Sequence, residues 1–128
     1  MKEDMKQALE GLRKAIGDDY RRAWVVQING NPEGYIAKQS EDYEELFSFV
    51  EGKKYIKVVV DENRRRRPGY GRAWGFIVNT HDDNKFSYGD ILMASSWSRP
   101  ARNVARGNVL GDYMVKWTGP MYVYHYKK

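Results

Sequence analysis

The sequence predicts an α+β fold: one domain in which a twisted antiparallel meander of about four to six strands carries one or two helices on one face. Apolar residues recur at helical spacing in residues 1–17, and residues 55–60 and 73–79 alternate as paired strands do. Residues 1–50 are expected to add the helix and a hairpin to a sheet core over 52–126. At 128 residues, of which 41% are hydrophobic, the chain is long enough for one hydrophobic core.

The predicted N-terminal amphipathic helix has a single apolar face. The residues on that face are three or four positions apart, and they are Met1, Met5, Leu9, Leu12 and Ile16. Gly17 is a natural C-terminal stop, so we expect the helix to end there. Residues 23–28 are then predicted to form a strand. Asn29-Gly30 supplies turn chemistry, and residues 35–38 are a candidate returning strand of the hairpin.

Residues 40–51 allow two interpretations. Ser40 can cap a short helix with acidic residues in its first turn. Alternatively, residues 47–50 form a strand that turns at Glu51-Gly52. We favour a helix that ends near Leu46 and gives way to a strand.

The central segment is predicted to be a three-stranded meander. Residues 55–60 and 73–79 form its first hairpin, a polar turn covers 81–85, and residues 86–94 return as the third strand. On the second strand, period-two alternation divides the two faces. One face is expected to carry Trp74, Phe76 and Val78, and the other Gly75 and Ile77. Residues 95–108 are expected to be irregular or briefly helical, and residues 121–126 to form a final strand.

The charge of the chain is divided unevenly. Residues 1–63 hold ten Lys+Arg and thirteen Asp+Glu, a net of −3, whereas residues 64–128 hold twelve and four, a net of +8. Such an asymmetry favours an electropositive face that attracts polyanions. The strongest local contribution is the run Arg64, Arg65, Arg66 and Arg67, with Arg72 close behind.

This arginine run is predicted to be an exposed loop at the tip of the central hairpin. Pro68 and two glycines interrupt helix and strand, and four adjacent guanidinium groups repel one another. Arginine suits phosphate oxygens, and Tyr70, between two glycines, is a candidate for stacking on a base. The alternative is a loop that only solubilises the surface.

A second basic segment contains Arg99, Arg102 and Arg106, shortly after Trp97. If this segment is helical, the spacing of three and four places the arginines on one side. Trp97 is then either a lid over the core or a stacking platform. A third candidate surface is an aromatic row near the C-terminus that either covers the core side of the sheet or is exposed and binds a protein partner or bases. It consists of Trp117, Tyr122, Tyr124 and Tyr126.

Catalytic signatures find little support. The chain has no cysteine, which excludes disulfides, thiol catalysis and cysteine-ligated clusters. His81 is followed by two aspartates, a pattern typical of a turn, and His125 alternates with tyrosines. A conceivable nuclease set is Asp61-Glu62 and Asp90 with Lys85, but no spacing supports it. We therefore expect no enzyme, no metal and no cofactor.

Several short motifs in a fixed order resemble a family of small uncharacterised bacteriophage proteins. The resemblance covers roughly residues 52–109. It rests on Gly52-Lys53-Lys54-Tyr55, Phe76-Ile77-Val78, Gly89-Asp90, Ala94-Ser95-Ser96-Trp97, Pro100-Ala101 and Arg106-Gly107-Asn108. It implies phage origin and a compact domain, and it implies no activity. The four-arginine run and the first fifty residues depart from the family pattern.

These features predict a small non-catalytic phage protein that binds nucleic acid, DNA or RNA, through the arginine-rich tip and the second basic segment. The alternative is a protein–protein module, either an inhibitor of a host enzyme or defence complex or a minor virion component. No apolar run approaches a membrane span, and the N-terminus is too polar for a signal peptide. The expected location is the host cytoplasm, or the virion.

Overall fold

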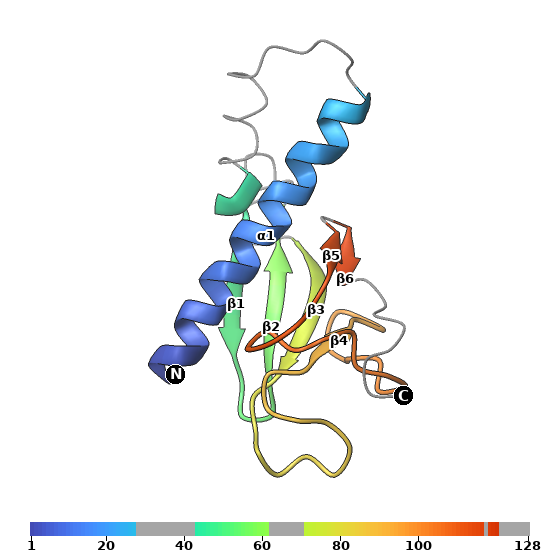
Figure 1. Ribbon diagram of the computed structural model, residues 1–128. Helices are drawn as coiled ribbons and strands as arrows, with labels where there is room; N and C mark the ends of the chain where they lie inside the picture. Colours follow the sequence, from blue (N-terminus) through green and yellow to red (C-terminus); the bar gives the residue numbers. More distant parts are fainter. Residues whose placement is uncertain (28–42, 62–70, 117, 121–128) are drawn as a thin grey trace.

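The computed structural model describes residues 1–27, 43–61, 71–116 and 118–120, with only the backbone described for 23–27. The fold is α+β, as predicted: one long helix lies beside a four-stranded antiparallel sheet and a small two-stranded sheet (Figure 1). Its elements are α1 (Glu3–Gln27), β1 (Phe47–Glu51), β2 (Tyr55–Val60), β3 (Arg72–Val78), β4 (Ile91–Met93), β5 (Val115–Lys116) and β6 (Gly119–Pro120).

The main sheet is a meander in the order β1-β2-β3-β4, with every neighbouring pair antiparallel. This confirms the predicted hairpin: β2 has its predicted bounds, and β3 begins and ends one residue early. Val60 is the partner of Arg72, so the two strands are paired up to the residues that flank the arginine run. The strand predicted over residues 121–126 lies outside the described residues.

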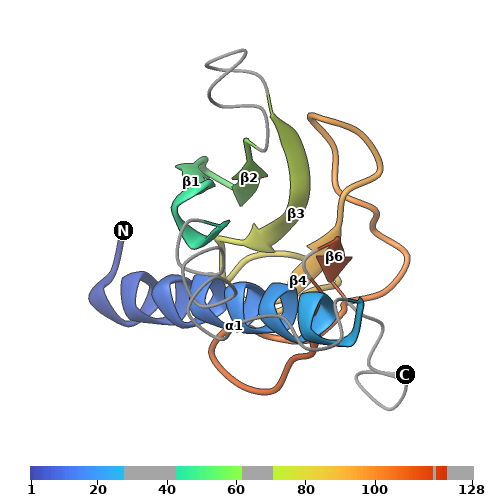
Figure 2. The same cartoon turned by 90° about the horizontal axis from the view of Figure 1, so that it is seen from above.

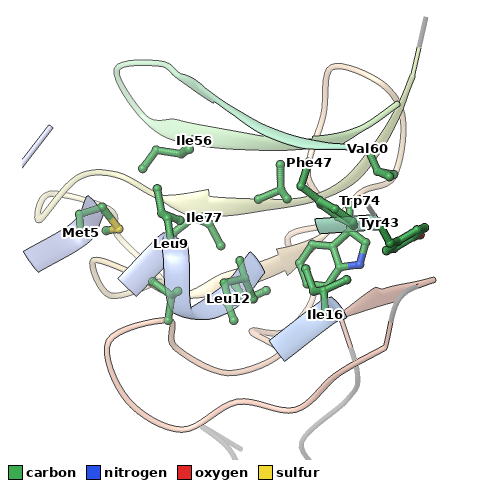
Figure 3. Close-up of a cluster of buried hydrophobic side chains, with 13 residues drawn as sticks. Met5, Leu9, Leu12, Ile16, Tyr43, Phe47, Ile56, Val60, Trp74 and Ile77 are labelled. Carbon is green, nitrogen blue, oxygen red and sulfur yellow. The ribbon is translucent and has the colours of Figure 1, made fainter. Parts of the chain in front are cut away.

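α1 lies along one face of the sheet, which we call the inner face (Figure 2). Four of the five predicted apolar residues are buried against this face, with at most 2% of each residue exposed: Met5, Leu9, Leu12 and Ile16. On β2 every second residue is buried, and Ile56, Val58 and Val60 join the same cluster (Figure 3). Met1 is 41% exposed and precedes the helix. No helix among the described residues is long and apolar enough to cross a bilayer.

The prediction that the helix ends at Gly17 is wrong, and so is the strand predicted over residues 23–28, because α1 runs to Gln27. Tertiary contacts explain the extension. Gly17 is buried against the side chain of Glu44, and Tyr20 stacks on Tyr43 with ring centroids 4.1 Å apart. This packing offsets the cost of about 1 kcal/mol that glycine imposes inside a helix.

The favoured interpretation of residues 40–51 is confirmed where the structure describes them. Residues 43–45 are helical, Leu46 is in a turn, and β1 begins at Phe47. Ser40 and the hairpin predicted over residues 29–38 lie outside the described residues.

The predicted alternation on β3 is wrong at Trp74. The register between β2 and β3 shifts after Val58, which pairs with Gly75, whereas Val59 pairs with Ala73. Trp74 is therefore the extra residue of a β-bulge, and a bulge interrupts period-two alternation. Its side chain joins Ile77 in the cluster beneath α1, where the indole Nε1 donates to the Lys116 carbonyl at 3.0 Å. Phe76 and Val78 belong to a second cluster.

The third strand of the meander is shorter than predicted, because β4 covers only Ile91–Met93. Gly89 adopts a positive φ of 91°, and the buried Asp90 carboxylate accepts from the Ser87 N–H at 2.9 Å. This turn replaces the first half of the predicted strand. Beyond β4, the chain returns along its free edge through isolated bridges between Ala94 and Pro100 and between Asp90 and Asn108.

The opposite side of the sheet, which we call the outer face, is covered over β3, over β4 and at Tyr55 of β2, and is more exposed over β1 and the rest of β2. Phe76, Val78 and Leu92 are buried there with Phe86 and Ala105. The covering segments, residues 79–90 and 94–108, contain no helix or strand. The outer-face positions of β1 and β2 are partly or fully exposed, as at Val50, which is 56% exposed.

Replacing Leu12 by Ala is expected to lower the unfolding free energy by about 2–5 kcal/mol, because the side chain is fully buried between α1 and the sheet. Urea melts measure this loss. Lys14→Ala on the exposed side of the same helix is the control. A loss for Leu12→Ala below about 0.5 kcal/mol would show that α1 is not part of the cooperative core.

The two glycines of α1 are expected to respond oppositely to alanine. At Gly11 a Cβ would meet only the Tyr113 hydroxyl, at 3.9 Å, so Gly11→Ala should stabilise the protein by about 0.5–1 kcal/mol. At Gly17 a Cβ would overlap the Glu44 side chain, so Gly17→Ala should give no gain or a loss. Thermal melts compare the two variants directly, and an equal gain at both positions would contradict the close packing at Gly17.

Candidate nucleic-acid interface

The arginine run and Tyr70 lie outside the described residues, but the strands on either side of them are described. Asp61 follows β2 and Gly71 precedes β3, so residues 62–70 connect the paired ends of one hairpin. Arg72, the first residue of β3, donates from Nη1 to the Thr118 carbonyl at 3.1 Å. The hairpin is thus confirmed, and the exposure of its tip stays a prediction.

Residues 95–108 are irregular, and the helical alternative for them is wrong. Their backbone extends the sheet: the Ala101 N–H donates to the Met93 carbonyl and the Arg106 N–H to the Ile91 carbonyl, both at 2.7 Å. In the stretch from Met93 to Ala101, the Ser95 and Ser96 N–H groups both donate to the Arg99 carbonyl and close a tight loop. Arg99, Arg102 and Arg106 therefore do not share the side of a helix.

Arg102 is held inside the covering layer of the outer face. Its guanidinium donates to both carboxylate oxygens of Asp83 at 3.0 Å and to the Tyr55 hydroxyl at 2.6 Å. The group also lies 4.9 Å from the centroid of the Phe86 ring. A bidentate carboxylate occupies the fork that a phosphate would need. We therefore assign Arg102 a structural role and leave it out of the interface.

The contact between Arg102 and Asp83 shifts the pKa of both side chains. Asp83 is only 8% exposed, and the hydrogen bond from Arg102 holds the pKa of its carboxyl well below the usual range, against the opposing effect of desolvation. Backbone N–H groups of Phe86 and Lys85 lower that pKa further. The same hydrogen bond raises the pKa of Arg102 above its ordinary value. Lys85 adds a second tie, donating from Nζ to the carbonyls of Arg102 and Asn103 at 2.7 and 2.9 Å.

Trp97 is not a lid over the core. The residue is 49% exposed, and the Lys57 ammonium lies over its ring, 4.1 Å from the centroid. Lys57 projects from β2 on the side opposite Ile56 and Val58, hence onto the outer face. Lys57 was not among the predicted site residues, although its place between two apolar strand residues signals an outward side chain.

Arg99 and Arg106 complete the cations of this segment. Arg99 is exposed, and none of the described carboxylates lies within ion-pair distance of its guanidinium or of the Lys57 ammonium. Arg106 is half-buried and donates from Nη2 to the Met93 sulfur at 3.6 Å. Arg99 thus presents an uncompensated charge two residues from the exposed indole.

The residues considered for catalysis have other roles. Asp90 is fully buried, and its carboxylate accepts from Ser87 N–H and from Asn108 Nδ2 at 3.0 Å. Lys85 is engaged by carbonyl groups, and His81 stacks on Tyr88 at 4.3 Å. Within the described ranges, no group of three His, Cys, Asp or Glu residues could hold a metal ion. Asp90 and Lys85 therefore do not form an accessible carboxylate–lysine site.

The candidate protein interface near the C-terminus lies outside the described residues. This applies to Trp117, Tyr122, Tyr124 and Tyr126, and to His125.

No protein-family model, no curated protein and no solved structure matches the chain.

The structural role of the Asp83–Arg102 pair predicts that the free energy of unfolding depends on pH. Because the pKa of Asp83 is depressed in the folded state, its contribution to stability is present above the unfolded-state pKa of about 3.9 and is lost as pH falls through the folded-state value. Asp83→Asn should lower the unfolding free energy at neutral pH by about 1–3 kcal/mol. It should also flatten the acid-side decline of stability.

Urea melts from about pH 7 down to about pH 2 measure both effects. Asp82→Asn, at the exposed neighbouring position, is the matched control and should leave the curve unchanged. An acid-side slope that is the same in Asp83→Asn and the unmodified protein would contradict the assignment.

Proposed function

We propose that this chain is a small non-catalytic protein that binds nucleic acid by contacting phosphates. The contacts come from the hairpin that carries Arg64–Arg67 and Arg72 and from Arg99 and Arg106 on the segment that follows β4. Binding of this kind needs no cofactor and is independent of sequence to first order, since phosphate contacts position a protein without specifying bases. The motif order over residues 52–109 supports a phage origin.

The observation that carries this proposal is how few carboxylates the basic half of the chain presents at its surface. Of the four acidic residues in the second half of the chain, Asp83 is paired with Arg102, and Asp90 is buried among hydrogen-bond donors. Only Asp82 and Asp112 are exposed there. The sequence over residues 64–128 carries a net charge of +8, and two of its four carboxylates are already engaged inside the fold.

The second candidate is a protein–protein module, a factor that inhibits a host enzyme or defence complex or a minor virion component. Two apolar side chains of the segment that passes α1 favour it: Leu110 is 43% exposed and Met114 is 59% exposed. Nuclease treatment separates the two candidates. A partner held through nucleic acid is released by nuclease, whereas a protein partner that is bound directly stays.

Binding should depend steeply on salt, because neutralised phosphates release counterions. If four or five phosphates are contacted, log affinity against log salt should have a slope of about −4 on duplex DNA. Replacing Arg64–Arg67 together by Gln should flatten the slope by about three and weaken all sequences alike. Fluorescence anisotropy with labelled DNA and RNA at several salt concentrations measures both quantities.

The matched control removes the same charge from the N-terminal helix region. Lys2, Lys6, Lys14 and Arg21 are exposed positions at or near the polar side of α1, and their combined replacement by Gln should change the slope far less. Equal effects of the two variants would show that only net charge matters. No binding to DNA or RNA at about 50 mM salt would exclude the nucleic-acid proposal and favour the protein module.

A further inference from the structure

We propose that Trp97, Lys57 and Arg99 form a stacking site for an unpaired base on the outer face of the sheet, so that the chain prefers single-stranded nucleic acid to duplex. This inference rests on the proposed function and names its substrate class. It uses described residues only and does not depend on the arginine run.

The site lies where the covered half of the outer face meets the exposed half. Phe76 and Leu92 are buried under the covering segments, whereas Val50, the cross-strand partner of Lys57, is 56% exposed. Cross-strand partners in an antiparallel pair project to the same face. Trp97 reaches the Lys57 side chain, so the indole borders an open strip of β1 and β2.

The residues at this border can contact both the base and the phosphates of a nucleotide. A half-exposed indole offers a flat surface on which a base stacks, as in proteins that bind single strands. The Lys57 ammonium lies over one face of the ring, which leaves the other face for the base, and together with the exposed Arg99 guanidinium it offers charge to the phosphates on either side of that base. With no described carboxylate in ion-pair distance, these two cations favour an anionic partner over an apolar one, and the exposed indole favours an anion that carries flat aromatic bases.

The arrangement fits an unpaired base better than a duplex. In a duplex the faces of the bases are covered by their neighbours, so an exposed tryptophan on a sheet has no base to stack on. Duplex readers commonly place a helix in the major groove. Here the apolar side of α1 is buried against the sheet, and its first turn contains Glu3 and Asp4, which a phosphate backbone would repel.

The test compares variants on single strands and on duplex of matched length. Labelled oligothymidine and oligouridine of about 20 nucleotides and a mixed-sequence duplex are titrated by fluorescence anisotropy. Trp97→Ala should weaken single-strand binding by about 5- to 150-fold and duplex binding by less than about twofold, with no change in the salt slope. Trp97→Phe, which keeps an aromatic ring, should restore most of the affinity. Comparing the two oligomers shows whether DNA or RNA is preferred.

Three further variants test the charge of Arg99 and the location of the site. Arg99→Gln should flatten the single-strand salt slope by about 0.7, whereas Lys116→Gln, an exposed charge on β5, should have less effect. Met114→Ala removes another exposed apolar side chain and should leave binding unchanged. Because Trp97 is half exposed, near-native thermal melts are expected for its variants.

The outcomes separate this inference from the proposed function. If the unmodified protein binds neither single strands nor duplex, both are overturned. If it binds and Trp97→Ala weakens both substrates equally or neither, only the stacking site is overturned. Selective loss of single-strand affinity that Trp97→Phe restores supports the site.

Discussion

The fold depends on one constraint: β3 is buried on both of its faces. All five residues from Trp74 to Val78 are inaccessible, so the sheet needs a covering layer on each side. α1 provides the inner layer through an apolar stripe at helical spacing. The outer layer is made from segments without helix or strand, which must satisfy their polar backbone groups by individual hydrogen bonds. A layer of this kind is held by specific side chains more than by regular secondary structure.

Because specific side chains hold the outer layer together, the arginines of the second basic segment have different roles. Arg102 joins residues 83–86 to residues 100–106, because its guanidinium donates two hydrogen bonds to the Asp83 carboxylate and one to the Tyr55 hydroxyl. Arg99 lies in the loop that projects beyond this layer and meets no described carboxylate. The two residues are the same type, three positions apart. Their roles are decided by whether an acidic side chain from a distant part of the chain lies within reach.

The sequence predicted the features that depend on local pattern. The strand bounds of β2, the pairing of β2 with β3 and the apolar side of α1 follow from periodicity and turn residues. The features that were missed depend on contacts between distant residues. Gly17 continues the helix because Glu44 and Tyr43 pack against that turn, and Trp74 changes sides because of a bulge. At the candidate site, the pattern located Trp97, Arg99 and Arg102, but no local signal indicated the contacts with Lys57 and Asp83.

Lys57 of the proposed stacking site lies on β2, the strand that leads into the arginine run, and this relation bears on how a strand would be held. Lys57 is three residues from the end of β2, about 10 Å at the rise of an extended strand. A single strand stacked on Trp97 therefore needs only a few nucleotides to reach the connection that carries Arg64–Arg67. Stacking changes little with salt, whereas phosphate contacts weaken steeply as salt rises. If both proposed contacts are made, the second becomes intramolecular once the first has formed, so each would raise the effective affinity of the other.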